Sequence, residues 1–103
     1  MEIKQKDKLR YYKFCDSEEN ILCNCVALLM KDNKADILHL QFKQNKFNKS
    51  FWKKIEMDLL TNDYYFIFFL LKENMNDYDI YLNKYKNLGF QTDYKKLPIS
   101  VYY

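Results

Sequence analysis

The sequence feature that most constrains the fold is the unbroken apolar run from Tyr64 to Leu71, YYFIFFLL. A strand with one solvent face alternates apolar and polar residues, whereas a strand covered on both faces is apolar throughout. A run of this length suits a strand and falls far short of the roughly 20 residues that span a bilayer. The chain is therefore expected to place this segment at the centre of a sheet, with other layers covering both faces.

Three segments before this run have the composition of strands. Leu9–Cys15 mixes aromatic and basic residues and suits an edge strand with its charges outward. Ile21–Met30 and Ala35–Phe42 flank a polar turn cluster at 31–34, which predicts a β-hairpin. A helix across 21–30 remains the alternative, because a short apolar run does not define its own period.

Two segments have the apolar spacing of an amphipathic helix. Ser50 is a suitable N-cap for the first, which extends to Thr61 with an apolar face of Phe51, Trp52, Ile55, Leu59 and Leu60. The second follows Asn76 and stops at Gly89, the only glycine, and its stripe consists of Tyr78, Tyr81, Leu82, Tyr85 and Leu88. A strand reaching to about Tyr94 follows, and Leu97–Tyr103 is expected to be the last strand.

The predicted order of elements is β-β-β-α-β-α-β-β, in a single α+β domain that covers residues 1–103. The strand, helix and strand from 35 to 71 should form a right-handed crossover, which makes the two strands parallel. The other strand pairs are expected to be antiparallel. The fold class is therefore a mixed sheet with two helices.

Charge and cysteine content narrow the classes of function. The 17 basic and 14 acidic residues leave a net charge of only +3, too small to indicate nucleic-acid binding by itself. Cys15, Cys23 and Cys25 lack the spacing of a metal site, so we expect no metal and predict buried free thiols. The N-terminus has no apolar signal segment, and a cytoplasmic location is expected.

The segment Tyr85-Lys-Asn-Leu-Gly-Phe90, between a predicted helix and a predicted strand, resembles the Y-x-x-L-G-F ending of the GNAT N-acetyltransferase superfamily. The element order over residues 21–103 is similar to the second half of that fold. The family's first helices are not expected, because only a short connection separates Cys15 from Ile21. The resemblance implies a GNAT-like fold and acetyl transfer from acetyl-CoA, with Tyr85 as general acid and His39 as candidate base.

The loop that binds the cofactor in this family resembles Q/R-x-x-G-x-G/A, in which glycines let backbone amides approach the pyrophosphate. The matching segment here is QNKFNK at 44–49, where Phe47 and Lys49 stand at the glycine positions. Their side chains crowd the path to the amides. If acetyl-CoA binds, the resemblance implies that it is held by Gln44, Asn45, Lys46, Asn48, Lys49 and Ser50.

Each candidate residue also has a structural interpretation, which we favour for Tyr85 and His39. Tyr85 belongs to the buried stripe of a helix, and a single strand histidine is more often structural than catalytic. The lysines of 43–54 form either a solvated helix entrance or a basic surface whose aromatic residues stack on nucleic-acid bases. Glu18 and Glu19 are assigned to solvent.

Two functions follow from these patterns. The first is a GNAT-like protein that has lost acetyl transfer, uses no cofactor and acts as a binding module, such as a viral, phage or mobile-element factor that acts on a host complex. Its partner surface would contain Lys46, Phe47 and Lys49, and the basic stretch 43–54 offers a surface for nucleic acid. The alternative is an active acetyl-CoA-dependent N-acetyltransferase.

Overall fold

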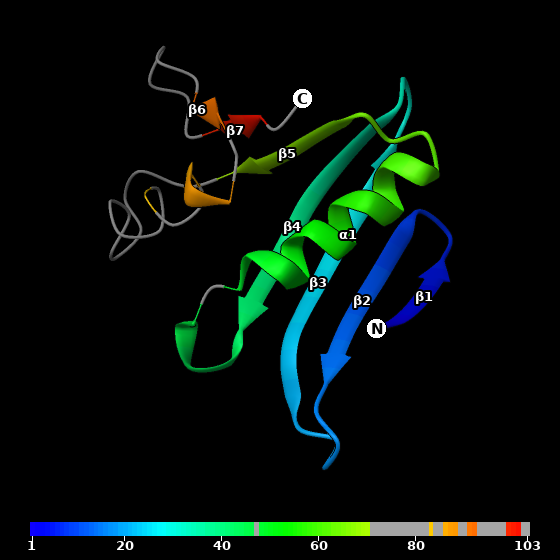
Figure 1. Ribbon diagram of the computed structural model, residues 1–103. Helices are drawn as coiled ribbons and strands as arrows, with labels where there is room; N and C mark the ends of the chain where they lie inside the picture. The colour runs from blue at the N-terminus through cyan, green and yellow to red at the C-terminus, as the bar shows by residue number, and fades with distance from the viewer. Residues whose placement is uncertain (47, 71–82, 84–85, 89–90, 93–98, 102–103) are drawn as a thin grey trace.

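The computed structural model describes residues 1–46, 48–70, 83, 86–88, 91–92 and 99–101. Seven strands form one mixed sheet in the order β1-β2-β3-β4-β5-β7-β6, and α1 crosses one face of that sheet (Figure 1). The elements are β1 (Glu2–Lys6), β2 (Leu9–Cys15), β3 (Ile21–Met30), β4 (Lys34–Phe42), the 3-10 turn η1 (Lys43–Asn45), α1 (Lys49–Thr61), β5 (Phe66–Leu70), β6 (Gln91–Thr92) and β7 (Ile99–Val101). The predicted α+β class with a mixed sheet is confirmed.

Strand pairing follows the predicted directions. β1 to β4 form an antiparallel meander, β4 and β5 pair in parallel through the α1 crossover, and β7 is antiparallel to both β5 and β6. The predicted hairpin is confirmed, and the alternative of a helix across 21–30 is wrong. Asp32 and Asn33 both adopt a φ of 62° in the hairpin turn. These two residue types tolerate the left-handed conformation, so the turn forms without glycine.

β1 was not predicted, and it changes the position of its neighbour. All five residues of β1 are exposed, and the strand pairs with β2 along its whole length. β2 therefore lies inside the sheet, and the prediction that 9–15 is an edge strand is wrong. Only Asp7 and Lys8 separate the two strands, and Asp7 turns the chain with a φ of 55°. Residues 1–42 consequently consist of strands and short turns alone.

Of the two predicted helices, α1 is the one whose full bounds the structure gives. The second prediction, between Asn76 and Gly89, falls largely outside the described residues. Asn83, Lys86 and Asn87 are helical there. Leu88, which was assigned to the buried stripe, is 2% exposed and belongs to the core.

The described core lies between α1 and the sheet face beneath it. Trp52, Ile55 and Leu59 of α1 are completely buried, and each such side chain contributes about 1.5–3 kcal/mol by leaving water. The ring of Phe51 packs on Phe14 of β2 with a centroid distance of 4.5 Å. The sheet contributes alternate residues of its strands: Tyr12, Phe14, Cys23, Cys25, Ala27, Leu29, Ala35, Ile37, Leu40, Phe42, Ile67 and Phe69. The predicted inner face of the helix is confirmed for Phe51, Trp52, Ile55 and Leu59, whereas Leu60 is only half-buried.

One thiol that was predicted to be buried is exposed, and one acidic side chain of α1 is buried. Cys15 is exposed, so the prediction of three buried thiols holds only for Cys23 and Cys25, which share one face of β3. Glu56 is buried among the apolar residues of α1, and Lys53 lies 3.6 Å from its carboxylate. The long stem of a lysine can reach over apolar surface while its ammonium group remains in water.

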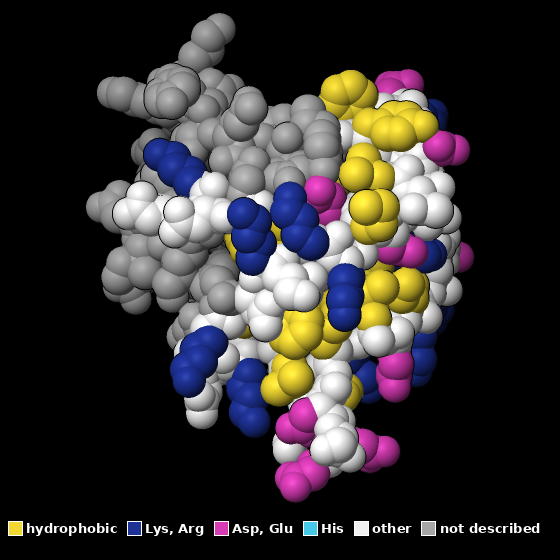
Figure 2. Space-filling view, in the orientation of Figure 1, with side chains coloured by type: hydrophobic (Ala, Val, Ile, Leu, Met, Phe, Trp, Pro, Cys, Tyr) yellow, Lys and Arg dark blue, Asp and Glu magenta, His cyan; other side chains and the backbone are white. Residues whose placement is uncertain are grey.

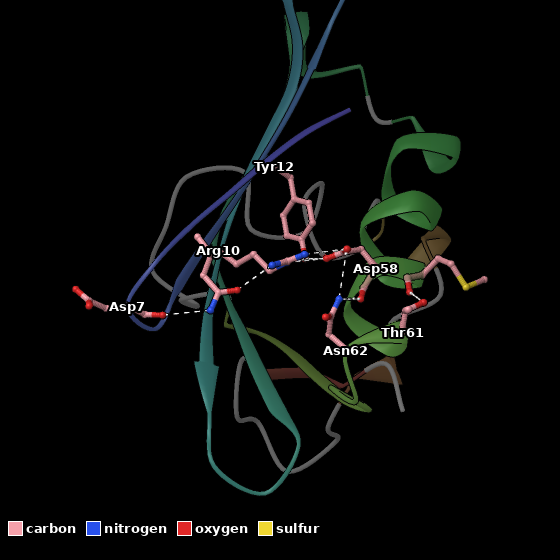
Figure 3. A network of polar contacts seen from close by, with 8 residues as sticks. Asp7, Arg10, Tyr12, Asp58, Thr61 and Asn62 are labelled. Carbon is pink, nitrogen blue, oxygen red and sulfur yellow. Dashed lines mark hydrogen bonds and ion pairs between the residues drawn. The ribbon is translucent and has the colours of Figure 1, made fainter.

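A polar network joins the last turns of α1 to β2 (Figure 3). Arg10 Nε and Nη2 donate hydrogen bonds to Asp58 Oδ2 and Oδ1 at 2.7 and 3.0 Å, and Tyr12 Oη donates to Asp58 Oδ2 at 2.5 Å. Asn62 Nδ2 donates to the backbone carbonyl of Asp58 at 2.7 Å. The planar guanidinium matches the geometry of a carboxylate, so the pair fixes direction as well as distance. The network therefore sets how α1 lies on the sheet.

Candidate functional site at the β4–α1 connection

The second half of β4 diverges from β5. The two strands pair only from Lys34 to Ile37 on β4 and from Phe66 to Phe69 on β5, although β4 continues to Phe42. Figure 1 shows β5 leading away from β4 beyond this point. The end of β4 therefore has an edge that β5 does not cover, and it leads directly into η1 and α1.

A β-bulge marks the place where the strands diverge. Val26 of β3 pairs with His39, but the next residue, Ala27, pairs with Ile37, so Leu38 is an extra residue in β4. Leu38 is 54% exposed. Bulges of this kind redirect side chains and are frequent beside functional sites.

The bulge overturns the predicted assignment of faces on β4. Strict alternation along 35–42 predicts that His39 shares a face with Ile37 and Gln41, and that Leu38 shares one with Leu40 and Phe42. Instead Ile37, Leu40 and Phe42 are buried under α1, and His39 is exposed on the opposite face of the sheet. The extra residue shifts the alternation by one position, so strict period-two counting fails after Ile37.

Asp36 is a candidate that the sequence reasoning missed. By strand register it lies between Leu28 of β3 and Phe68 of β5, on the same sheet face as His39. Burial raises the pKa of its carboxyl group. A carboxyl group with a raised pKa can exchange a proton closer to neutral pH. The signal in the sequence was a single acidic residue within the apolar segment 35–42.

At the position of the family's glycine-containing loop, this chain has the short turn η1, whose residues all have side chains. Gln44 adopts a φ of 55°, and the Lys46 amide closes the turn by donating to the Lys43 carbonyl at 3.0 Å. A hollow of about 220 Å³ opens beside it. Its walls are Leu22, Lys43, Gln44, Lys46, Asn48 and Phe51. This volume is below the roughly 300–1,000 Å³ that is usual for cofactor and drug-sized ligand pockets.

Asn48, and not Ser50, caps α1. Asn48 Oδ1 accepts hydrogen bonds from the amides of Ser50 at 2.9 Å and Phe51 at 3.4 Å. The helix consequently begins at Lys49, and the prediction that Ser50 is the N-cap is wrong. Backbone amides at a helix N-terminus are the groups that bind phosphate. In this structure two of these amides, those of Ser50 and Phe51, already donate to the side-chain oxygen of Asn48.

The connection contains all six residues that the resemblance assigned to the cofactor. Gln44, Asn45, Lys46, Asn48, Lys49 and Ser50 follow one another around η1 and the first turn of α1. Figure 2 shows several Lys and Arg side chains on this side of the molecule. The exposed lysines of η1, the segment after it and α1 are Lys43, Lys46, Lys49, Lys53 and Lys54. Phe47 and Tyr85 lie outside the described residues, so their positions relative to His39 stay predictions.

Two further properties of the described residues bear on function. They contain no group of three or more histidine, cysteine, aspartate or glutamate side chains arranged to hold a metal ion. Among the same residues, no helix combines the length and the apolar character that crossing a membrane requires.

Comparisons with known proteins identify the fold. No protein-family model matches the chain, and no curated protein matches it. Two solved structures are similar to it, each with a TM-score of 0.70: an acetyltransferase of the GNAT family from Staphylococcus aureus Mu50, with 13% identity, and GCN5 from Tetrahymena, with 9% identity.

The similarity extends beyond the expected residues 21–103. The two matches cover 91% and 93% of this chain, and 66% and 68% of the other chains. The chain thus spans about two thirds of the length of these acetyltransferase-fold structures. At such low identity the likeness concerns architecture alone, and on that basis the chain has the fold of the GNAT acetyltransferases.

Proposed function

We propose that this protein is a GNAT-fold binding module that has lost acetyl transfer. The observation that carries the proposal is the cap at α1, where Asn48 Oδ1 accepts from the amides of Ser50 and Phe51. A diphosphate that used these amides would have to displace the asparagine side chain. It would also have to pass Lys49, where the family's loop has a small residue.

The same connection provides a surface for a partner. Lys46 and Lys49 are exposed on either side of the cap, and Lys43 and Gln44 line the hollow beside them. An acidic protein surface would be attracted to these ammonium groups. Phe47, between the two lysines in sequence, is the proposed apolar anchor, since aromatic residues are enriched among the anchors of interfaces.

Acetyl-CoA titration tests the loss of cofactor binding. The melting temperature should not change with acetyl-CoA at about 1 mM, the upper end of ordinary KM values. A cofactor present at 100 times its Kd would instead stabilise the fold by about 2.7 kcal/mol, which raises the melting temperature of a domain this size by roughly 10 °C or more. A rise of that size would contradict the proposal. The same titration with Asn48→Gly is informative, because this variant frees the amides of Ser50 and Phe51.

A pull-down tests the partner surface. Changing Lys46, Phe47 and Lys49 together to alanine should abolish recovery of the partner. The matched control changes Lys31, Lys54 and Met57, which are exposed and remove the same charge and a comparable apolar side chain. Equal recovery by both triple variants would rule out this surface.

The second candidate function is an acetyl-CoA-dependent N-acetyltransferase. It is favoured by the divergence of β4 from β5 and by the raised pKa of Asp36 beside it. In this alternative Tyr85 protonates the departing thiolate, and His39 or Asp36 accepts a proton from the acceptor amine. Acetyl transfer to amine substrates that falls in Tyr85→Phe without loss of folding would establish the alternative.

A further inference from the structure

The sheet face opposite α1 has an unusual row of side chains across four strands. Strand register places Lys4 of β1 beside Tyr11 of β2, Tyr11 beside Val26 of β3, and Val26 beside His39 of β4. Their neighbours Tyr12, Cys25 and Leu40 are buried under α1, so this row faces the other way. Tyr11 is 39% exposed, and His39 is exposed.

Lysines surround this row. Alternation along β1, β2 and β4 places Lys4, Lys6, Lys13 and Lys34 on this face, against two carboxylates, Glu2 and Asp36. The Glu2 carboxylate lies 3.4 Å from the Lys13 ammonium group, so one of the two acidic side chains is already paired. Among the described residues of these three strands, the face therefore has more lysines than carboxylates.

The aromatic and basic groups meet at a shallow hollow. An open volume of about 710 Å³ lies over Lys4, Gln5, Lys6 and Tyr11. Its floor is the β1–β2 ribbon, and Tyr11 in it is 39% exposed. A ring that lies in such a hollow with ammonium groups on its border can stack on a base while the lysines contact the flanking phosphates.

We propose that this face binds single-stranded nucleic acid, with Tyr11 and His39 as stacking residues and Lys4 and Lys6 as phosphate contacts. The two rings are separated by two strand spacings, about 10 Å, which allows different bases to stack on each. A second copy of the chain fits less well because it would bring two sets of lysines together. An acidic peptide would satisfy the charges but would leave the two exposed rings without a specific role. The surface lies on the sheet face opposite α1, away from η1 and the cap at Asn48, and it shares His39 with the acetyltransferase alternative.

The test is fluorescence anisotropy of the full chain with labelled oligo(dT) and oligo(U) of about 15 nucleotides, near the upper site size of single-strand-binding domains. Each phosphate contact contributes about −0.7 to the salt slope for single strands. Binding through Lys4 and Lys6 should therefore weaken roughly sevenfold between about 50 and 200 mM salt. A duplex of the same length should compete poorly, because its bases are not available for stacking.

Variants separate stacking from charge. Tyr11→Leu should weaken binding about 5- to 100-fold, as expected for the loss of one stacked base, whereas Tyr11→Phe should bind as the wild type does. Lys4→Ala should lower the salt slope by about 0.7. Lys31→Ala in the turn between β3 and β4 and Tyr65→Leu before β5 are matched controls, both exposed and outside the row, and should change nothing. Melting temperatures of all variants confirm that they fold.

Three outcomes would overturn the proposal. The first is the absence of binding at low salt. The second is equal binding by Tyr11→Leu and the wild type, which would leave only non-specific attraction of a polyanion. The third is competition by polyglutamate at equal charge concentration, which would make the face a site for acidic polymers.

Discussion

Arg10 of β2 donates two hydrogen bonds to the two carboxylate oxygens of Asp58 in α1, across 48 positions of sequence. Both side chains are about five-sixths buried, with 16% and 15% of their surfaces exposed. Tyr12 donates to the same carboxylate, so Asp58 accepts from two residues of one strand. The pair is the main polar link between the helix and the sheet among the described residues.

Replacing Asp58 by alanine should lower the free energy of unfolding by about 2–3 kcal/mol, because it leaves a largely buried guanidinium group without its acceptor. Lys13→Ala is the control, since it removes an exposed ion pair with Glu2 that is worth about 0–1 kcal/mol. Urea denaturation of both variants measures the difference. Equal effects would mean that the Arg10–Asp58 pair does not anchor α1.

The free energy of unfolding should decrease at acidic pH, because Asp58 becomes protonated. Burial alone would raise the pKa of this carboxyl, but hydrogen bonds from Arg10 and Tyr12 outweigh burial and hold the pKa below its usual value. A group with a lowered pKa stabilises the fold above its unfolded value of about 3.9, and this contribution is lost as the pH falls through the folded value. Urea midpoints between pH 7 and pH 3 should therefore decline more steeply for the wild type than for Asp58→Asn. Parallel curves would contradict this assignment.

Substitution of the N-cap Asn48 should destabilise α1, whereas substitution of Ser50 should have little effect. Asn48→Ala should cost about 1 kcal/mol, whereas Asn48→Asp should be nearly neutral, because aspartate also accepts from the first amides. Ser50→Ala should change stability by less than about 0.5 kcal/mol, as expected for an exposed position without a special role. A larger loss at Ser50 than at Asn48 would restore the cap that the sequence first suggested.

Replacing Asp63, which follows the end of α1, by glycine should stabilise the protein. It adopts a φ of 68°, and the amides of Asp63 and Tyr64 donate to Leu60 and Leu59 in the pattern of a Schellman motif. Asp63→Gly should raise the free energy of unfolding by about 0.5–1 kcal/mol, because glycine adopts this conformation without a Cβ clash. The exposed bond from Tyr65 Oη to Asp63 Oδ1 is lost, at little cost. Asp63→Ala is the control, and it should give no gain.

The three thiols should differ in reactivity. Burial raises the pKa of Cys23 to about 12 and that of Cys25 also well above its usual value, whereas Cys15 is exposed. A disulfide reagent at pH 8 should therefore modify Cys15 alone in the folded protein and all three cysteines in denaturant, since the thiolate is the reacting form. Cys15→Ser should remove the reaction of the native state. Rapid modification of two or three thiols would show that the core opens readily.

Because the pKa values of Cys23 and Cys25 are raised, the protein should also become less stable at alkaline pH. A buried thiol stabilises the fold fully below its unfolded pKa of about 8.5, and that contribution is lost as the pH rises toward the folded value. The melting temperature should accordingly fall between pH 8.5 and pH 11, and Cys23→Ala should reduce the decline. A flat profile would contradict the burial of these thiols.

Segments that bury their own apolar residues could be predicted from the sequence. Ile21–Met30, the strand ending at Phe42 and the helix ending at Thr61 all have enough apolar residues to define a face, and each was found within one or two residues of its predicted bounds. β1 could not be found this way. Its segment EIKQK has one apolar residue, and it is a strand because β2 supplies backbone partners.

Local sequence patterns did not determine three details of the site: the N-cap of α1, the bulge in β4 and the position of Asp36. Asn48 and Ser50 are both suitable N-caps by residue type, and in the structure Asn48 accepts from the first amides. The bulge at Leu38 has no marker in the sequence, because the extra residue is as apolar as its neighbours. Asp36 was overlooked because its position between β3 and β5 depends on the pairing of β4 with β5, which lies about 30 positions later in the sequence.

The extra residue in β4 also determines where that strand can change its length. Removing Leu38 would leave Ile37, Leu40 and Phe42 directed toward α1, with His39 and Gln41 still directed away, so the strand would become regular without turning over. Removing Gln41 instead would turn Phe42 out of the core. A single site in β4 thus tolerates a one-residue deletion, and it lies where the strand leaves its parallel partner.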